Sequence, residues 1–105
     1  MDLLTTIKRL IVRDRYRLTL KSLDELRADG LRESDAKEAI LNAPCIRKVL
    51  KSTRPHRGRR AEKLYVIEGQ NYEGTLIYTK GRIVREGGAE VLYVYVSAKR
   101  SASRD

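Results

Sequence analysis

The sequence is poor in the residues that build metal sites, disulfides and large aromatic cores. Its 105 residues include one cysteine, one histidine and two prolines, with no tryptophan or phenylalanine. A lone cysteine, Cys45, cannot form an internal disulfide, which excludes a disulfide-stapled secreted domain. His56 and Cys45 are eleven residues apart and match no zinc-ligand spacing. We therefore expect neither a metal nor another cofactor.

Long apolar runs and the common catalytic motifs are also missing. No apolar run approaches the roughly 20 residues needed to cross a bilayer. The opening MDLLTTIKRLIV lacks the order of a signal peptide. GxxxxGK[ST] loops, GxSxG elbows and HExxH pairs are absent. The sequence thus predicts a soluble, cytoplasmic, single domain over residues 1–105 with no membrane partner, whose chemistry must come from Lys, Arg, Tyr, Glu and His.

Acidic residues are scarce in the second half of the chain. The whole sequence has 23 Lys and Arg against 14 Asp and Glu, a net charge of +9. Residues 1–43 hold nine of the basic and eight of the acidic residues, so the remainder carries +8. A field of this kind attracts nucleic acid through phosphate neutralisation, although an anionic membrane or an acidic protein would also respond to it.

The first half of the chain has helical patterns. Residues 2–12 place apolar side chains at helical spacing, and Asp2 is positioned to cap the helix. Residues 15–20 alternate as in a short strand, or alternatively Thr19 caps a helix. A helix is expected over 21–29, ended by Gly30, and another opens at Ser34 and closes at residues 42–44.

The second half has strand patterns. Segments 45–52, 64–67, 75–79 and 91–97 are rich in β-branched residues and tyrosine, and segments 69–74, 80–81 and 86–88 resemble turns. Helices followed by an antiparallel meander indicate an α+β fold. We expect two to three N-terminal helices packed on one side of a mostly antiparallel, four- to five-stranded sheet.

A basic loop is predicted between the first two of these strands, over residues 53–63, and a frayed tail over 101–105. The loop combines a proline, a glycine and the only histidine with five cations, which are Arg54, Arg57, Arg59, Arg60 and Lys63. So many charges cannot be buried without partners, so the loop is expected at the surface, where it binds a phosphate backbone or is simply a solvated hairpin tip. His56 is a candidate proton carrier, although a loop holds a general base poorly.

Two predicted strands end in lysine, namely Lys80 and Lys99. By alternation, Tyr78 shares a face with Lys80, and Lys99 continues the face that carries Tyr93 and Tyr95. These lysines either contact RNA or protect strand ends against edge pairing, and the tyrosines either pack at the edge of the core or stack on unpaired bases. Arg82, Arg85 and Arg100 lie nearby in sequence and are expected to contact phosphates.

Such residue types suffice for RNA cleavage. RNA carries its own nucleophile, the 2′-hydroxyl, so cleavage needs positioning, proton transfer and neutralisation of charge on the phosphorus. Lysine and arginine stabilise the phosphate, and a tyrosine or lysine can move a proton. A metal is not required for this chemistry.

Several segments together resemble a known family. They are YRLTLKSLDELRADGLRESDAKEAILNA at 16–43, KLYVIEG, LIYTKG and YVYVSAKRS. These resemble the small MqsR-like toxins encoded beside antitoxins with a YgiT-type zinc finger, a group that merges into the RelE-like ribonuclease superfamily. The resemblance spans residues 16–101, and its most specific element is the final strand ending in VSAKR.

The resemblance implies a function and a set of site residues. It implies an mRNA endonuclease, acting on free mRNA or on the ribosome, that halts translation and is held inactive by a cognate antitoxin. Tyr78, Lys80 and Lys99 stand where the family has candidate catalytic groups. Lys21 stands where many relatives have histidine, so it is expected to contact phosphate. The alternatives are a non-catalytic RNA- or ribosome-binding module and a regulatory domain that binds an acidic protein.

Overall fold

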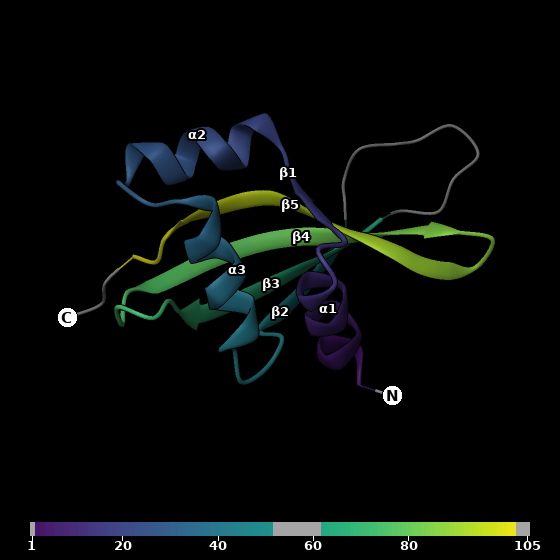
Figure 1. Ribbon diagram of the computed structural model, residues 1–105. Helices are drawn as coiled ribbons and strands as arrows, with labels where there is room; N and C mark the ends of the chain where they lie inside the picture. The colour runs from purple at the N-terminus through teal and green to yellow at the C-terminus, as the bar shows by residue number, and fades with distance from the viewer. Residues whose placement is uncertain (1, 52–61, 103–105) are drawn as a thin grey trace.

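The computed structural model of the protein describes residues 2–51 and 62–102, and it has an α+β fold in which three helices pack against a five-stranded sheet (Figure 1). The elements in chain order are α1 (Leu3–Val12), β1 (Tyr16–Leu18), α2 (Leu20–Ala28), α3 (Glu33–Leu41), β2 (Lys48–Lys51), β3 (Lys63–Gln70), β4 (Leu76–Glu86) and β5 (Ala89–Arg100). This architecture confirms the predicted fold class. Residues 53–61 of the predicted basic loop, which include His56, Arg54, Arg57, Arg59 and Arg60, and residues 103–105 of the tail lie outside the described residues.

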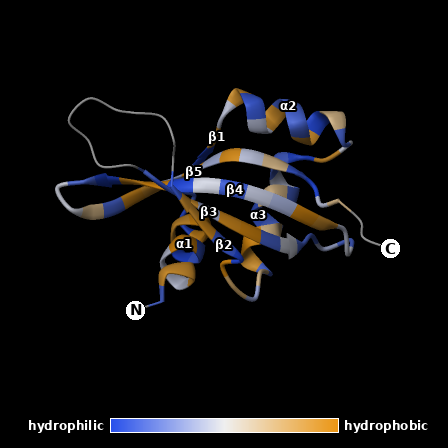
Figure 2. Ribbon diagram, turned by 180° about the vertical axis from the view of Figure 1, so that it is seen from behind, coloured by the Kyte–Doolittle hydropathy of each residue, from blue (hydrophilic) through white to orange (hydrophobic). Residues whose placement is uncertain are grey.

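The sheet has the strand order β1-β5-β4-β3-β2. β2 to β5 form the antiparallel meander expected from the sequence, whereas β1 pairs in parallel with β5. In Figure 1, α1 and α3 lie in front of the sheet and α2 runs beside β5. Figure 2 views the molecule from behind, where the strands lie in front of α1 and α3. We call this second side of the sheet the open face.

Local signals set the ends of the helices. Both interpretations of residues 15–20 hold, because β1 ends at Leu18 and Thr19 then caps α2 by accepting a hydrogen bond from the Ser22 N–H at 3.2 Å. Gly30 has a φ of +70°, and it lets the Leu31 N–H return to the Leu26 carbonyl at 2.8 Å. None of the described helices is long and apolar enough to cross a membrane.

Two of the helix starts differ from the predicted caps. Asp2 precedes α1 as expected, but its side chain makes no capping hydrogen bond. α3 begins at Glu33 rather than at Ser34. The reason is that the Asp35 carboxylate accepts a hydrogen bond from the Arg32 N–H at 2.7 Å, which fixes the first turn one residue earlier.

The core lies between the helices and the covered face of the sheet. Ile7, Ile40, Ile67 and Ile77 are fully buried there, together with Tyr93 and Tyr95. The two tyrosine rings meet edge to face at 5.4 Å, and the Tyr95 hydroxyl donates to the Ala36 carbonyl at 2.9 Å. Burial raises the pKa of the Tyr95 hydroxyl well above its usual value. These tyrosines are therefore core residues and not the base-stacking surface that was considered from the sequence.

The sheet approaches its neighbours closely at two glycines. A Cβ on Gly69 would lie 1.9 Å from the Ala39 carbonyl oxygen of α3. A Cβ on Gly81 would lie 2.5 Å from the Tyr93 ring. Gly81 thus makes room for a buried ring, which is why β4 continues through the turn predicted at 80–81. The chain reverses instead at Gly87 and Gly88, within the predicted turn at 86–88.

A bulge in β5 changes which face its last residues occupy. Gly81 pairs with Tyr95 but Lys80 pairs with Ser97, so Val96 is an extra residue on β5. The alternation of side chains changes phase there. Tyr93 and Tyr95 are on the covered face, whereas Lys99 pairs with Tyr78 on the open face. The expectation that Lys99 continues the face of the two tyrosines is therefore wrong.

Candidate nucleic-acid interface

β4 carries the polar side chains at the centre of the open face. Ile77, Thr79 and Gly81 are buried on its covered side. Tyr78, Lys80 and Arg82 alternate with them and therefore project to the open face. The structure thus places Tyr78 and both predicted catalytic lysines on the same side of the sheet.

Cross-strand pairing aligns these residues into three rows. The tyrosine row consists of Glu68, Tyr78 and Lys99. The lysine row consists of Lys48, Val66 and Lys80. The arginine row consists of Arg82, Val94 and Arg17. Neighbouring rows are two residues apart along β4, so they are about 7 Å apart. Each row contains at least one cation.

The tyrosine row forms the floor of a pocket of about 560 Å³. The Lys99 ammonium lies over the Tyr78 ring, 5.6 Å from its centroid, in the geometry of a cation–π contact. Cations also surround the pocket, which is lined by Arg47, Lys48 and Arg100 as well as by Lys99. Lys80 does not line it, but its Cα is the diagonal neighbour of Lys99 across β4 and β5. The pocket therefore offers several positive groups around one phenol.

Glu68 is the carboxylate of this pocket. Its side chain is only 10% exposed, and it is engaged by the Arg47 guanidinium and by the Ser101 hydroxyl, which donates to it. Arg47 comes from the segment before β2, and Ser101 follows β5. Glu68 consequently connects both ends of the pocket to strand β3.

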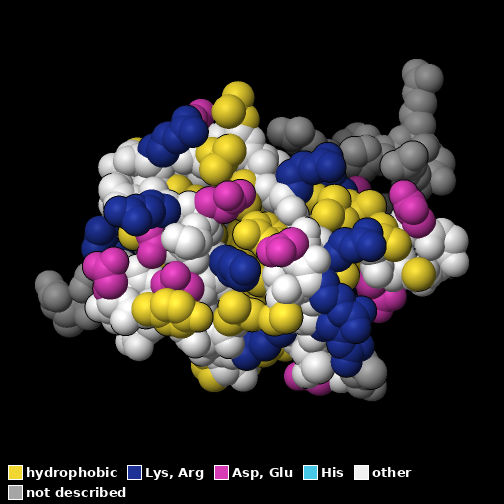
Figure 3. Space-filling model, viewed as in Figure 1, with side chains coloured by type: hydrophobic (Ala, Val, Ile, Leu, Met, Phe, Trp, Pro, Cys, Tyr) yellow, Lys and Arg dark blue, Asp and Glu magenta, His cyan; other side chains and the backbone are white. Residues whose placement is uncertain are grey.

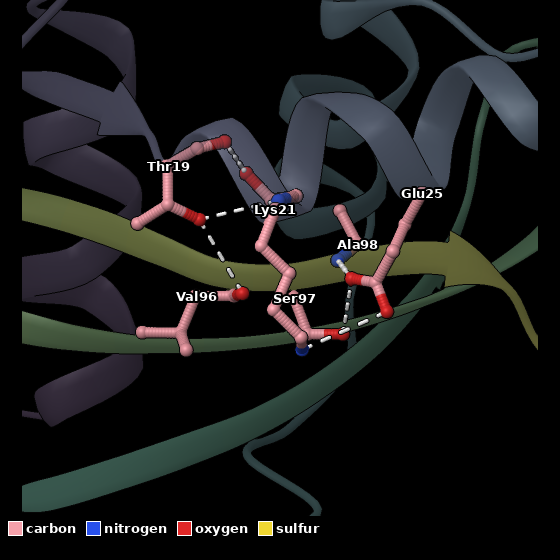
Figure 4. Close-up of polar contacts among 7 residues, drawn as sticks. Thr19, Lys21, Glu25, Val96, Ser97 and Ala98 are labelled. Atoms are coloured by element: carbon pink, nitrogen blue, oxygen red, sulfur yellow. Dashed lines mark hydrogen bonds and ion pairs between the residues drawn. The ribbon is translucent and has the colours of Figure 1, made fainter.

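α2 seals the free edge of β5 beside the pocket (Figure 4). β1 covers that edge only as far as Tyr95. Beyond it, the Glu25 carboxylate accepts from the Ala98 N–H at 3.2 Å and from the Ser97 hydroxyl at 2.7 Å. One turn later, Asp29 accepts from the Arg100 N–H at 2.8 Å. Lys21, predicted to contact phosphate, lies at this edge with its Nζ 3.7 Å from Glu25, and its side chain is 62% exposed.

Glu25 couples the fold to pH. Burial tends to raise the pKa of the Glu25 carboxyl, but the hydrogen bonds from Ser97 and Ala98 and the nearby lysines outweigh it, so the pKa is lowered. Because its pKa is lowered in the folded protein, the Glu25 carboxylate stabilises the fold at pH values above its unfolded pKa. This stability is lost as the pH falls through the folded pKa.

We expect Glu25→Gln to lower Tm at pH 7 and to lower it less at pH 3. Thermal unfolding at both pH values measures this, with Asp24→Asn, an exposed carboxylate of the same helix, as the control. Equal losses at both pH values would contradict the assignment.

The remaining predicted contacts are more dispersed. Arg100 lines the pocket, and its Nη2 donates to the Asp29 carbonyl at 3.3 Å. Arg82 is on the open face, 3.6 Å from the Glu62 carboxylate. Arg85 pairs with Glu90 at 3.1 Å near the β4–β5 turn, and Lys63 begins β3 directly opposite Lys51. The structure therefore brings Tyr78, Lys99 and Arg100 together in the pocket, with Lys80 beside it. Lys21 lies at the edge of β5, and Arg85 and Lys63 lie away from the pocket.

Four residues of this surface were not predicted, namely Arg17, Arg47, Lys48 and Glu68. Arg17 reaches the open face because β1, near the start of the chain, pairs with β5, near its end. Arg47 and Glu68 are twenty-one residues apart, and only the β2–β3 pairing joins them. Alternation within β3 could have placed Glu68 on the face of the sheet opposite to that of Ile67. However, no feature of the neighbouring sequence indicates which residues bind Glu68.

Charge differs between the two sides of the molecule. Figure 3 shows the helix side, where acidic and basic side chains are intermixed. On the open face, the three rows contain five cations and one carboxylate, and that carboxylate is already paired with Arg47. Among the described residues, no cluster of three or more His, Cys, Asp or Glu could hold a metal ion. A polyanion is the ligand that this surface fits best.

Comparisons with protein-family models, with curated proteins and with solved structures find no match to this chain.

Proposed function

We propose that this protein is an endoribonuclease that cuts single-stranded messenger RNA, and that it acts as the toxin of a toxin–antitoxin pair. One observation carries the proposal. Lys99 lies over the ring of Tyr78 in a pocket on the open face, with Lys80 as its diagonal neighbour. The cationic rows that cross β4 and the sequence resemblance to MqsR-like toxins support it.

The rows suggest how RNA lies on the protein. A sugar–phosphate chain running along β4 meets cations in the tyrosine row, in the lysine row and in the arginine row. Phosphate contacts of this kind fix register without reading sequence. They place a phosphodiester over the pocket, where Tyr78 and Lys99 are the central groups.

The chemistry follows from the groups in the pocket. The 2′-oxygen of the RNA attacks the adjacent phosphorus, a new bond forms between them, and the bond from phosphorus to the 5′-oxygen breaks. Glu68, the cross-strand neighbour of Tyr78, accepts the 2′-hydroxyl proton, and the Tyr78 hydroxyl protonates the leaving oxygen. Lys80 and Lys99 neutralise the charge that develops on the phosphoryl oxygens. The products are a 2′,3′-cyclic phosphate and a 5′-hydroxyl.

The proposed partners follow from the resemblance rather than from the pocket. They are messenger RNA, free or held on the ribosome, and a cognate antitoxin with a zinc-finger domain that binds the toxin and blocks cleavage. In this role the protein halts translation in the cytoplasm.

The test is cleavage of a short single-stranded RNA by the purified protein in the presence of EDTA. We expect products with 2′,3′-cyclic phosphate and 5′-hydroxyl ends, identified by mass spectrometry. In a matched oligonucleotide, a single 2′-deoxy substitution at the cleaved nucleotide should abolish the cut, because it removes the nucleophile. Induced expression should also arrest growth and create new 5′ ends in cellular mRNA.

Two results would refute the proposal. The first is salt-sensitive RNA binding without any cleavage, which would identify a non-catalytic RNA-binding module. The second is equal cleavage of the 2′-deoxy oligonucleotide, which would exclude attack by the 2′-hydroxyl. Tight binding to an acidic protein with no affinity for RNA would instead indicate a regulatory interaction domain.

A further inference from the structure

A second hollow adjoins the pocket on the other side of Glu68. It has a volume of about 420 Å³, and its lining residues include Asn42, Pro44, Gln70 and Leu76 in addition to Glu68. Gln70 and Leu76 are cross-strand neighbours in the row that follows the tyrosine row. The hollow is therefore one row, about 7 Å, from the phosphodiester proposed to lie over Tyr78.

The walls of this hollow have the chemistry of a nucleobase site. Leu76 is 43% exposed, and with Pro44 it offers apolar surface. Asn71 also lines the hollow, but its amide is already in use, because it donates to Asp35 at 3.0 Å and accepts from the Glu73 and Thr75 N–H groups. The Asn42 amide donates to the Gln70 carbonyl at 2.8 Å.

The Gln70 side chain is different. It is exposed, and within residues 2–51 and 62–102 its amide has no hydrogen-bond partner. A free primary amide offers one acceptor and two donors in a plane. Glutamine uses this pair to bind adenine, donating to N7 and accepting from the N6 amino group. Gln70 thus lines the hollow with an amide whose donors and acceptor are all free within the described residues, and such a group can distinguish one base from another.

We propose that this hollow binds a nucleobase next to the scissile phosphate, and that Gln70 selects adenine there. The inference rests on the proposed ribonuclease function and adds the base that the enzyme prefers. The phosphate contacts of the cationic rows are the same for every sequence, whereas Gln70 makes a contact that depends on the base.

The test exchanges the hydrogen-bonding pattern at position 70. Wild type, Gln70→Glu and Gln70→Ala are incubated with single-stranded RNA containing a randomised segment, and the product ends are sequenced. We expect wild type to favour adenine beside the cut by about 5- to 150-fold, the range of one good bidentate contact. Gln70→Glu should shift the preference to cytosine, whose amino group donates to a carboxylate. Gln70→Ala should cut with little preference.

Controls separate this inference from the proposed function. Glu86→Gln, an exposed change near the β4–β5 turn, should keep the wild-type preference, and thermal unfolding should show that every variant is folded. A preference that is the same in wild type and Gln70→Glu refutes the role of Gln70 while leaving the ribonuclease intact. If wild type does not cut RNA, the proposed function fails. The base site is then judged by fluorescence anisotropy, in which equal binding of oligoadenylate and oligocytidylate by wild type refutes it as well.

Discussion

The Lys80→Ala, Lys99→Ala double variant is expected to cleave RNA at least about 100-fold more slowly than wild type, by analogy with the loss of one preorganised charge-stabilising donor. Both ammonium groups lie on the open face, on diagonal positions of β4 and β5. Removing them takes away the two cations that are proposed to neutralise the developing phosphoryl charge. Single-turnover cleavage of the short RNA measures the loss, and RNA binding measured separately should fall much less.

A matched variant distinguishes this effect from a general loss of charge. Arg13→Ala, Lys37→Ala also removes two positive charges, but from the C-terminal end of α1 and from α3. This variant should bind RNA slightly more weakly than wild type, and its single-turnover cleavage rate should stay within about threefold of the wild-type rate. The reason is that long-range electrostatic steering acts on association and not on the chemical step. Equal loss of rate in both double variants would mean that the lysines act only through net charge.

Gly69→Ala is expected to have the largest effect on stability. The new methyl group would lie 1.9 Å from the Ala39 carbonyl oxygen and 3.2 Å from the Ala43 Cα, both of which are backbone atoms of the α3 region. No side-chain rotation can relieve that contact, so α3 must move off the sheet. We expect a loss of about 3 kcal/mol or more, equivalent to about 12–24 °C in Tm for a domain of this size, measured by thermal unfolding.

Gly74→Ala is the control for this substitution. Gly74 also lies close to the end of β3, but nothing is within 4 Å of the position of its Cβ. Its φ of +86° makes alanine strained, so a loss of about 1 kcal/mol is expected. If Gly69→Ala cost no more than Gly74→Ala, the close approach of α3 to β3 would be wrong.

The fold could be predicted from the sequence because its signals are local. Apolar spacing gave the three helices, Gly30 ended α2, and β-branched runs gave the meander. The strand predicted at 75–79 was too short, because Gly81 was interpreted as part of a turn. A glycine needed for a close approach looks the same in sequence as a glycine needed for a turn, and only the burial of Tyr93 distinguishes them.

The site was predicted in part for the same reason. Alternation correctly placed Tyr78 with Lys80, since β4 is regular across both residues. It put Lys99 on the face of Tyr95, because the extra residue Val96 leaves no mark in the sequence. The proposed role of Lys99 beside Tyr78 came from the family resemblance, and the bulge explains how the two residues reach the same face. The partners of Glu68 depend on pairing between distant segments, which periodicity cannot supply.

The seal that α2 places along β5 has a consequence for self-association. An unpaired strand edge is a template on which another chain can add, and sheets with one uncovered face are exposed to this hazard. Here the Ala98 and Arg100 N–H groups are already occupied by the carboxylates of Glu25 and Asp29. At the opposite border β2 is only four residues long and begins and ends with lysine. Within the described residues, neither of these edges offers a long apolar ladder to another chain, although one face of the sheet is open.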